Sequence, residues 1–317
     1  IVALCDVDFS GTAKASVEKF PKAKRYADFR RMLDEVKHID AVTISTPDHT
    51  HVHAAVDAMQ RGIHVYVQKP LAHNIRETRL LTEMARKHKV VTQMGNQGAS
   101  NPNLKYVHDW VDSGKLGKIH LVETWTNKPV WPQGSAFPAA DESQRPKALN
   151  WDLWLGPAKA IPYTPDIHPF KWRGWWEYGT GALGDMGCHI IDIPYRTLGL
   201  GYPTSAQCSV GTVFTRLWVP DYHPQGAPAT SSVTLTFDAT DKTQSPIKMI
   251  WLDGGIRPTH PEIIPADHDI GGSGGETGVL IHGENGVIST NVNDSSPLMP
   301  RLYLNDGTIE MGPQTED

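Results

Sequence analysis

Apolar and polar positions alternate in two different ways along the chain. In the first hundred residues, short apolar runs typical of buried strands are separated by stretches with helical spacing. The expected strands are Ile1–Cys5, Arg25–Ala27, Ile39–Ser45, His64–Val67 and Val90–Met94, and the expected helices are Ser10–Phe20, one capped by Asp28, His51–Gln60 and Ile75–His88. This alternation predicts a parallel, doubly wound sheet whose chemistry lies at the carboxyl ends of its strands.

From about Leu104 onward the runs follow period-two alternation with little helix between them. Turns such as Glu284-Asn285-Gly286 join consecutive runs, as in antiparallel sheets. The strands expected here are Ile119–Thr126, Ala206–Val213, Ser232–Phe237, Ile247–Leu252, Val279–His282 and Val287–Thr290. We predict one domain over residues 1–98 and a second, of the α+β class with an open and mainly antiparallel sheet, over residues 99–317. Gly271–Gly275 is expected to be a surface loop.

The composition excludes several classes of protein. Among 317 residues, 39% are hydrophobic and 21% are charged, and no run approaches the roughly 20 apolar residues that cross a bilayer. The formal net charge is −5, which indicates no basic surface for nucleic acid. Three scattered cysteines give neither a disulfide framework nor a zinc site. We expect no nucleic-acid or membrane partner and no metal, although His49, His51 and His53 leave metal binding as an alternative.

Asp6 directly follows the first apolar run. At this point of a dinucleotide-binding sheet, a carboxylate accepts hydrogen bonds from the adenosine ribose and repels a 2′-phosphate, which favours NAD over NADP. The alternative is an aspartate that caps a helix. The glycine loop that would hold the pyrophosphate is expected before residue 1.

The string Gly179-Thr-Gly-Ala-Leu-Gly184 has the spacing G-x-G-x-x-G, but we reject it as a phosphate loop. No apolar strand precedes it, and Asp185 would place a negative charge where a helix N-terminus should bind a pyrophosphate. We expect these glycines to let backbone pass close to a ligand or to another strand.

Asp185, His189 and Asp192 fall at i, i+4 and i+7 and predict one polar stripe on an otherwise apolar helix. The stripe is either an internal hydrogen-bond cluster or a functional site. In the second case Asp185 sets the pKa and the tautomer of His189, which then acts as a general base toward an alcohol.

Two further segments lie at predicted strand ends. Lys69 follows one strand, and Pro70 favours an extended lysine that points away from the sheet edge, although most lysines at strand ends are simply solvated. The turn Ser45–His51 ends the preceding strand, where backbone groups and small hydroxyls can meet a cofactor.

All ten tryptophans lie after residue 109, and three cluster at Trp172, Trp175 and Trp176. Most are expected in the core or at an interface. The alternative is a sugar site, because a sugar ring stacks on indole while charged neighbours such as Arg173 hydrogen-bond its hydroxyls.

Three strings in this order resemble the Gfo/Idh/MocA oxidoreductases, the glucose-fructose oxidoreductase and inositol dehydrogenase family. They are STPDHTH at residues 45–51, GIHVYVQKPL at residues 62–71 and GALGDMGCHIID at residues 181–192. The resemblance implies a Rossmann domain that lacks its first strand and glycine loop here, an α+β domain and a bound NAD, with NADP less favoured. It also implies that Lys69 is the lysine of the E-K-P motif, with Gln68 in place of glutamate, and that Asp185 and His189 are the D-x-x-x-H pair.

The expected function is an NAD-dependent oxidoreductase that removes hydride from a secondary hydroxyl of a sugar, glycoside or polyol. The alternatives are a glycosidase that uses tightly bound NAD transiently and a non-catalytic sugar-binding or assembly protein. The candidate catalytic residues are Lys69, Asp185 and His189; the candidate cofactor residues are Asp6, Ser45, Thr46, Pro47, His51, Gln68, Lys69 and Asn96; the candidate substrate residues are Gln97, Trp172, Arg173 and Tyr178.

We also expect a homodimer or homotetramer formed through the sheet of the second domain, because a broad open sheet leaves one face to cover. The expected compartment is the cytoplasm, or the periplasm or exterior if a leader precedes residue 1. The closing residues 305–317 are expected to stop short of the family's last elements.

Overall fold

The computed structural model describes residues 1–271, 276–292 and 298–312 and divides the chain into two compact units. The first unit comprises residues 1–95 and 136–180, and the second comprises residues 96–135 and 181–317. The sequence analysis places a single boundary after residue 98. The structure differs because the segment of residues 136–180 packs with the first unit.

Every strand pair of the first unit is parallel, as the sequence predicts. β1 pairs with β2, and β3, β4 and β5 form a three-stranded sheet in that order. The bounds are β1 Ala3–Cys5, β2 Lys24–Tyr26, β3 Ala41–Ile44, β4 His64–Gln68 and β5 Thr92–Gly95. Among the described residues the two sheets share no hydrogen-bonded strand pair. The carboxyl ends of β3, β4 and β5 therefore form one edge with three loops.

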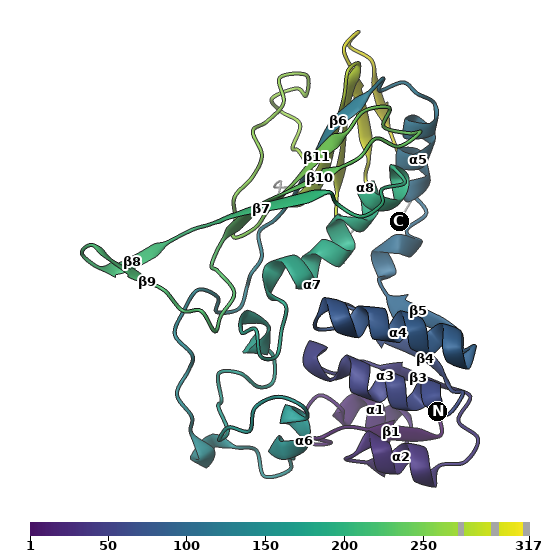
Figure 1. Ribbon diagram of the computed structural model, residues 1–317, viewed down its shortest axis with the longest axis vertical. Coiled ribbons are helices and arrows are strands. Elements are labelled where there is room, and N and C mark those ends of the chain that lie inside the picture. Colours follow the sequence, from purple (N-terminus) through teal and green to yellow (C-terminus); the bar gives the residue numbers. More distant parts are fainter. Residues whose placement is uncertain (272–275, 293–297, 313–317) are drawn as a thin grey trace. The chain divides into compact units, whose positions relative to one another are not determined.

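Four helices connect these strands (Figure 1). Their bounds are α1 Lys14–Lys19, α2 Phe29–Glu35, α3 His51–Gln60 and α4 Ile75–His88. The predicted bounds of α3 and α4 are confirmed, and Asp28 caps α2 by accepting a hydrogen bond from the Arg30 amide. α3 and α4 bury one apolar face each against Val65 and Val67 of β4, which forms the core of this unit.

Residues 136–180 form an aromatic segment with little regular structure. It contains the helix α6 Trp151–Leu155 and the short turns η3 Glu142–Gln144 and η4 Lys171–Gly174. The rings of Trp151 and Trp154 stack with their centroids 4.7 Å apart. Asn150 caps α6 through the Leu153 amide and donates its own backbone N–H to the carbonyl of Val7, just beyond β1. Such contacts explain why this segment belongs to the first unit.

The second unit contains an eight-stranded sheet in the order β15-β14-β13-β12-β6-β11-β10-β7. All of its neighbouring pairs are antiparallel except β6 with β11. The bounds are β6 Ile119–Thr126, β7 Ser205–Val210, β10 Ser231–Phe237, β11 Ile247–Leu252, β12 Thr277–Gly283, β13 Gly286–Asn291, β14 Arg301–Leu304 and β15 Ile309–Met311. The predicted α+β class and mainly antiparallel sheet are confirmed.

The single strand predicted over Ala206–Val213 is wrong, because the chain leaves the sheet after Val210. A Cβ at Gly211 would lie 2.3 Å from the Cγ2 methyl of Thr230, so any larger residue here would require that side chain to move. The chain then forms a separate hairpin of β8 Val213–Arg216 and β9 Val219–Asp221, which projects away from the sheet (Figure 1). Its tip exposes 82% of Leu217 and 86% of Trp218.

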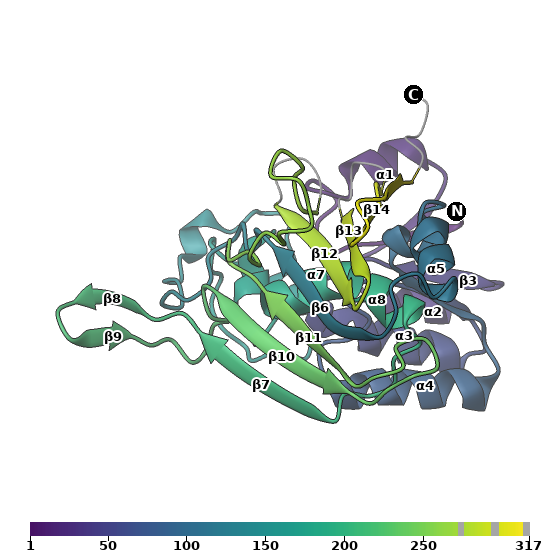
Figure 2. The ribbon, with the colours of Figure 1, turned by 90° about the horizontal axis from the view of Figure 1, so that it is seen from above.

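The two faces of the sheet are covered by different parts of the chain. Neighbouring residues of β12 point to opposite faces and show both coverings. Val279 and Ile281 join the core formed with α5 Leu104–Asp112, α7 Gly181–Ile190 and α8 Asp192–Thr197 (Figure 2). Leu280 joins a smaller cluster with Ile264 and Ile270, which lie on the loop after β11. This loop covers part of the face that the sequence analysis leaves open, and self-association stays a prediction. Beyond Gly271, the predicted glycine-rich loop lies outside the described residues.

Candidate functional site

The carboxyl edge of the β3-β4-β5 sheet carries several of the predicted cofactor residues. Ser45 and Thr46 follow β3 and are exposed, and Pro47 beside them is half-buried. Lys69 directly follows β4, as the sequence predicts, and is half-buried. Asn96 and Gln97 follow β5 in the chain and belong to the second unit.

His51 connects two loops of this edge. Its Nε2 lies 2.8 Å from the carbonyl oxygen of Thr46, and its Nδ1 lies 2.9 Å from the carbonyl oxygen of Pro70. Burial lowers the pKa of His51, although the two carbonyls favour its charged form. The sequence analysis assigns His51 to the cofactor. The structure instead uses both ring nitrogens to join the loop after β3 to the loop that carries Lys69.

Gln68 lies beneath the backbone of Lys69. Its Oε1 accepts a hydrogen bond of 3.3 Å from the Lys69 amide, and a Cβ at Gly95 would lie 2.6 Å from the same oxygen. Gly95 therefore leaves room for this amide at the end of β5. Farther along the loop, His73 Nε2 lies 3.2 Å from the carbonyl of Gly179. Local side chains thus fix the loop that carries Lys69.

Asp6 directly follows β1 and does not cap a helix. The first helix begins only at Lys14, because the carboxylate of Asp8 accepts hydrogen bonds from the amides of Ser10 and Gly11 and forms a turn there. The Asp6 carboxylate accepts one hydrogen bond, 2.9 Å long, from the Asp8 amide. Burial raises the pKa of Asp6. The helix-cap alternative is excluded, and the ribose-binding role remains.

These residues fit the ribose and nicotinamide ends of a dinucleotide. The carboxylate of Asp6 follows β1, and exposed hydroxyls follow β3 at Ser45 and Thr46. Both are groups that ribose hydroxyls and a carboxamide can hydrogen-bond. Gly179 does not supply the phosphate loop, since a Cβ there would lie 2.5 Å from the Arg173 Cα. The close approach of Gly179 to the backbone of Arg173 confirms the prediction that a glycine of this string lets two backbone segments pass close together.

The predicted substrate residues of the first unit are mostly part of an aromatic core. Trp172, Trp175 and Tyr178 are buried in one cluster with Trp151 and Trp154. Only 1% of Tyr178 is exposed, and burial raises the pKa of its hydroxyl to about 12. The structure therefore gives Trp172 and Tyr178 a packing role. Of the three clustered tryptophans, Trp176 is the exposed one.

Arg173 stacks its guanidinium on two rings of this segment. The guanidinium carbon lies 4.2 Å from the Trp172 ring centroid and 4.4 Å from that of Phe170. A planar cation on an aromatic face is a rigid donor for sugar hydroxyls or carboxylates. Arg173 remains a candidate for substrate binding.

In the second unit, Asp185 and His189 lie one turn apart on α7, and both are buried. Asp192 does not continue their stripe, because α7 ends at Ile190 and Asp192 begins α8, where it pairs with Arg196 at 3.6 Å. Pro194 explains the break, since it cannot donate to the carbonyl of Ile190 and its ring would clash there. The prediction of a three-residue stripe is therefore wrong for Asp192.

The ring of His189 is held by Asn96. His189 Nδ1 lies 2.9 Å from Asn96 Oδ1, and Asn96 Nδ2 donates a 2.7 Å hydrogen bond to the carbonyl of Cys188. The sequence analysis assigns Asn96 to the cofactor and the tautomer of His189 to Asp185. The structure instead places the Asn96 amide at Nδ1. Asn96 and His189 are 93 positions apart, and no sequence motif joins them.

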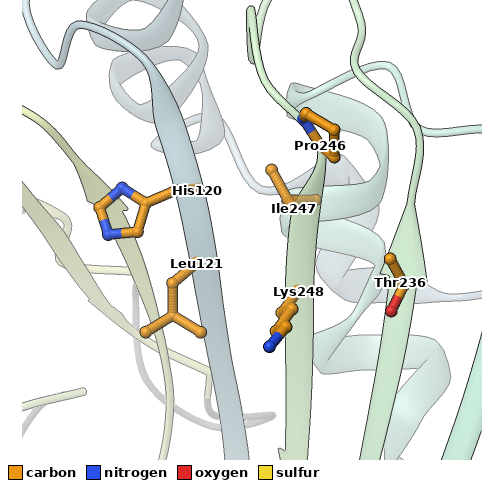
Figure 3. A pocket seen from close by; sticks show the side chains of 6 residues that line it. All are labelled: His120, Leu121, Thr236, Pro246, Ile247 and Lys248. Carbon is orange, nitrogen blue, oxygen red and sulfur yellow. The ribbon is translucent and has the colours of Figure 1, made fainter.

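Two surface hollows are lined by none of the predicted site residues. One, of about 400 Å³, lies on the sheet of the second unit between β6, β11 and β10, where His120, Lys248 and Thr236 line it (Figure 3). The other, of about 620 Å³, lies in the first unit beside β2 and α2.

Within the described ranges, no three or more His, Cys, Asp or Glu side chains are grouped to hold a metal ion. None of the helices described has both the length and the hydropathy needed to span a bilayer.

Three family models match successive parts of the chain. One described as "Oxidoreductase family, NAD-binding Rossmann fold" matches residues 1–96. One described as "Oxidoreductase family, C-terminal alpha/beta domain" matches residues 101–206, and the "GFO/IDH/MocA C-terminal domain" matches residues 159–255. Together these matches extend over most of the chain.

Named relatives include two dehydrogenases. Levoglucosan dehydrogenase of Pseudarthrobacter phenanthrenivorans is 23% identical over 214 residues, which are 66% of this chain and 44% of that protein. Inositol 2-dehydrogenase of Salmonella typhimurium is 28% identical over 124 residues, which are 38% of this chain and 36% of that protein. The chain matches less than half the length of each of these relatives.

Solved structures with the same fold include a levoglucosan dehydrogenase in complex with NADH and L-sorbose. It has a TM-score of 0.63 at 16% identity and covers 98% of this chain and 69% of its own. An inositol dehydrogenase homologue from Azotobacter vinelandii, complexed with NADH and myo-inositol, has a TM-score of 0.61 at 17% identity and covers 98% of this chain and 67% of its own. The predicted fold class, a Rossmann domain with an α+β domain of mainly antiparallel sheet, is confirmed.

Proposed function

We propose that this chain, which belongs to the Gfo/Idh/MocA family of oxidoreductases, functions as an NAD-dependent dehydrogenase acting on a secondary hydroxyl of a sugar, glycoside or polyol. Two relatives are named as dehydrogenases of levoglucosan and of inositol, and the family description of residues 1–96 names NAD. The residues at the carboxyl edge of the first unit support this cofactor.

The observation that carries the proposal is the pair Asp185 and His189 on α7. A helix that also buries Met186 and Ile190 in an apolar core holds a carboxylate and an imidazole one turn apart. Ionisable side chains are seldom buried unless they are paired or hydrogen-bonded, and such buried groups are enriched at functional sites. An imidazole in such a setting suits proton transfer at neutral pH.

In the proposed mechanism His189 removes the proton from the substrate hydroxyl. Lys69 stabilises the alkoxide that develops on the same oxygen, because an ammonium group favours negative charge nearby. Asp185 orients the basic side chains, and Asp6 holds the adenosine ribose. When bound, NAD supplies a nicotinamide that accepts the hydride from the carbon.

The proposal is tested by following NADH formation with the full-length protein and a panel of sugars, glycosides and polyols that includes levoglucosan and myo-inositol. Stoichiometric NADH release with one of them supports a dehydrogenase. Release of an aglycone that requires NAD but accumulates no NADH would instead identify the redox-assisted glycosidase. Binding of sugar with neither product would identify the non-catalytic alternative.

The shared role of Lys69 and His189 has its own test. If both groups act on one substrate oxygen, removing the second after the first costs little more, so the double variant with both replaced by Ala should lose far less than the product of the single losses in kcat/KM. Fully multiplicative losses would contradict a shared site.

A further inference from the structure

The side chain of Asn96 makes two hydrogen bonds to adjacent residues of α7. Its Nδ2 lies 2.7 Å from the carbonyl oxygen of Cys188, and its Oδ1 lies 2.9 Å from Nδ1 of His189. Asn96 and His189 are both buried. The two bonds use both ends of one amide, so they fix the rotation of the side chain as well as its position.

The chemistry of the two partners fixes which end of the amide faces which. A backbone carbonyl can only accept a hydrogen bond, so the NH₂ group of Asn96 must face Cys188. The amide oxygen then faces His189, and because that oxygen can only accept, Nδ1 must carry the hydrogen. In the neutral ring the lone pair is consequently on Nε2.

The demand for a donor at Cys188 comes from the end of the helix. Carbonyls in the last turn of a helix have no partner within it, and α7 ends at Ile190. The Gly187 carbonyl is bonded by the amide of Ile191, while that of Cys188 receives Asn96. Asn96 therefore donates to a carbonyl in the last turn of α7, and this bond fixes the direction of its amide oxygen.

We infer that Asn96 is a positioning residue that holds His189 in the Nδ1–H tautomer and so makes Nε2 the nitrogen that accepts the substrate proton. The statement about the tautomer concerns the protein alone, whereas the catalytic part rests on the proposed function. Asn96 acts through His189 and is assigned no contact with substrate.

A neutral acceptor at Nδ1 suits this role better than a carboxylate. A carboxylate at hydrogen-bond distance stabilises the imidazolium and raises the pKa of its histidine by about 1 to 3 units. The amide of Asn96 fixes the same tautomer without adding a charge, so it does not favour a protonated ring at neutral pH. A base must start the reaction unprotonated.

The tautomer can be measured directly in protein labelled with ¹⁵N-histidine, without substrate or activity. The long-range ¹H–¹⁵N couplings of the ring distinguish Nδ1–H from Nε2–H, and the His189→Gln spectrum assigns the signal. We expect Nδ1–H in the wild type and a shift toward Nε2–H in Asn96→Leu. An Nε2–H ring in the wild type would overturn the inference whether or not Asn96→Leu folds.

The kinetic test uses Asn96→Asp, which keeps an acceptor at Nδ1. We expect the acid limb of the pH profile of kcat/KM to move up by about 1 unit or more, and Asn96→Leu to lower kcat by about 10- to 100-fold with KM nearly unchanged. Asn103→Asp is the matched control, because Asn103 is also buried in the second unit and its amide donates to the carbonyl of Leu298. This control should lower stability without moving the acid limb.

The two tests separate failure of the inference from failure of the proposed function. An unmoved acid limb in an active Asn96→Asp enzyme would overturn the positioning role of Asn96. An Nδ1–H ring in a protein that oxidises no hydroxyl would leave the tautomer assignment standing and remove the proposed function.

Discussion

Each unit of the molecule contains a buried imidazole close to a predicted catalytic residue, and the two rings are held in opposite ways. His51 in the first unit faces two backbone carbonyls, one at each ring nitrogen. His189 in the second unit faces a side-chain amide at Nδ1. Both residues are almost fully buried, with 1% and 3% of their surface exposed, so burial alone does not distinguish them.

The partners of each ring decide what it can do. A ring whose two nitrogens each face a backbone carbonyl contacts both segments that supply the carbonyls and leaves neither nitrogen for a substrate; it donates to one carbonyl when neutral and to both when charged. His51 thus ties the loop containing Thr46 to the loop containing Lys69. At His189 the amide oxygen of Asn96 accepts a hydrogen bond from Nδ1 and so orients the ring. Because Nδ1 carries the hydrogen, Nε2 is the basic nitrogen of the neutral ring. The comparison predicts that His51 contributes stability and His189 contributes chemistry.

Replacing His189 gives the largest expected effect. We expect His189→Ala to lower kcat by about 10² to 10⁴, as for loss of a general base, while the affinity for NAD and the melting temperature change little. Steady-state kinetics, NAD titration and thermal unfolding measure the three quantities. His120→Ala, an exposed histidine of the same unit, is the control. A normal kcat with a raised KM would make His189 a binding residue and move the base to Lys69.

Replacing His51 should give the reverse pattern. In His51→Gln the flexible amide replaces a rigid ring that fills the space between the two carbonyls and fixes both loops, so we expect the unfolding free energy to fall by about 2 to 3 kcal/mol. We expect kcat to fall only about tenfold, because the loop of Lys69 loses a support rather than a reacting group. Denaturant unfolding and kinetics measure both.

His53→Gln serves as the control for this variant, since His53 lies on the same helix and is exposed. The acid limb of the pH profile should stay unchanged in both variants. A kcat loss as large as that of His189→Ala with unchanged stability would break the comparison, because His51 would then be part of the chemistry.

The two imidazoles also show which features can be read from the sequence. The bounds of α3 and α4 follow from local spacing and were predicted correctly, and the position of Lys69 follows from the end of β4. The partners of His51 are within 19 positions of it but are backbone carbonyls, which no residue type reveals. The sequence analysis therefore placed His51 at the carboxyl edge of the sheet, where the structure has it, but assigned it to the cofactor instead of to the two loops that it joins.

The contact of Asn96 with His189 depends on tertiary structure alone, since the two residues are 93 positions apart. A local signal did exist for the end of α7, because Pro194 four residues after Ile190 cannot continue the helix. The packing of residues 136–180 with the first unit had no periodic signal either, since aromatic residues and backbone bonds such as that from Asn150 to Val7 hold it there.

A third imidazole sharpens the comparison through pH. His49 has its Nε2 3.2 Å from the carbonyl of Trp154 and packs against the rings of Trp154 and Tyr178. Burial lowers its pKa from 6.5 to about 4. The folded state therefore binds fewer protons than the unfolded state between these values, and stability falls as the pH is lowered from about 6.5 toward 4.

We expect the contribution of His49 to unfolding free energy to fall by about 2 kcal/mol between pH 7 and 5, at up to about 1.4 kcal/mol per pH unit. Denaturant unfolding of wild type, His49→Gln and His53→Gln across this range measures it. The His49 variant should lose stability less steeply with acid than the other two proteins. Parallel curves for all three would show that His49 is not held neutral.

The smallest expected effect concerns Asp6, which separates cofactor binding in the first unit from proton transfer in the second. In Asp6→Ser the repulsion of a 2′-phosphate is lost, so we expect NAD to bind more weakly, NADP to bind more tightly and the ratio of their Kd values to change by about tenfold, or about 1.4 kcal/mol. Because burial raises the pKa of Asp6, the wild-type preference should also weaken as acid protonates this carboxyl. Titration of both nucleotides into wild type, Asp6→Ser and the exposed control Asp40→Ser measures the ratio, and the acid limb that reports His189 should be the same in all three. A wild type that binds NADP more tightly than NAD would remove Asp6 from the ribose site. If the acid limb of the kcat/KM profile instead moves in Asp6→Ser, cofactor binding at Asp6 and proton transfer at His189 are not independent.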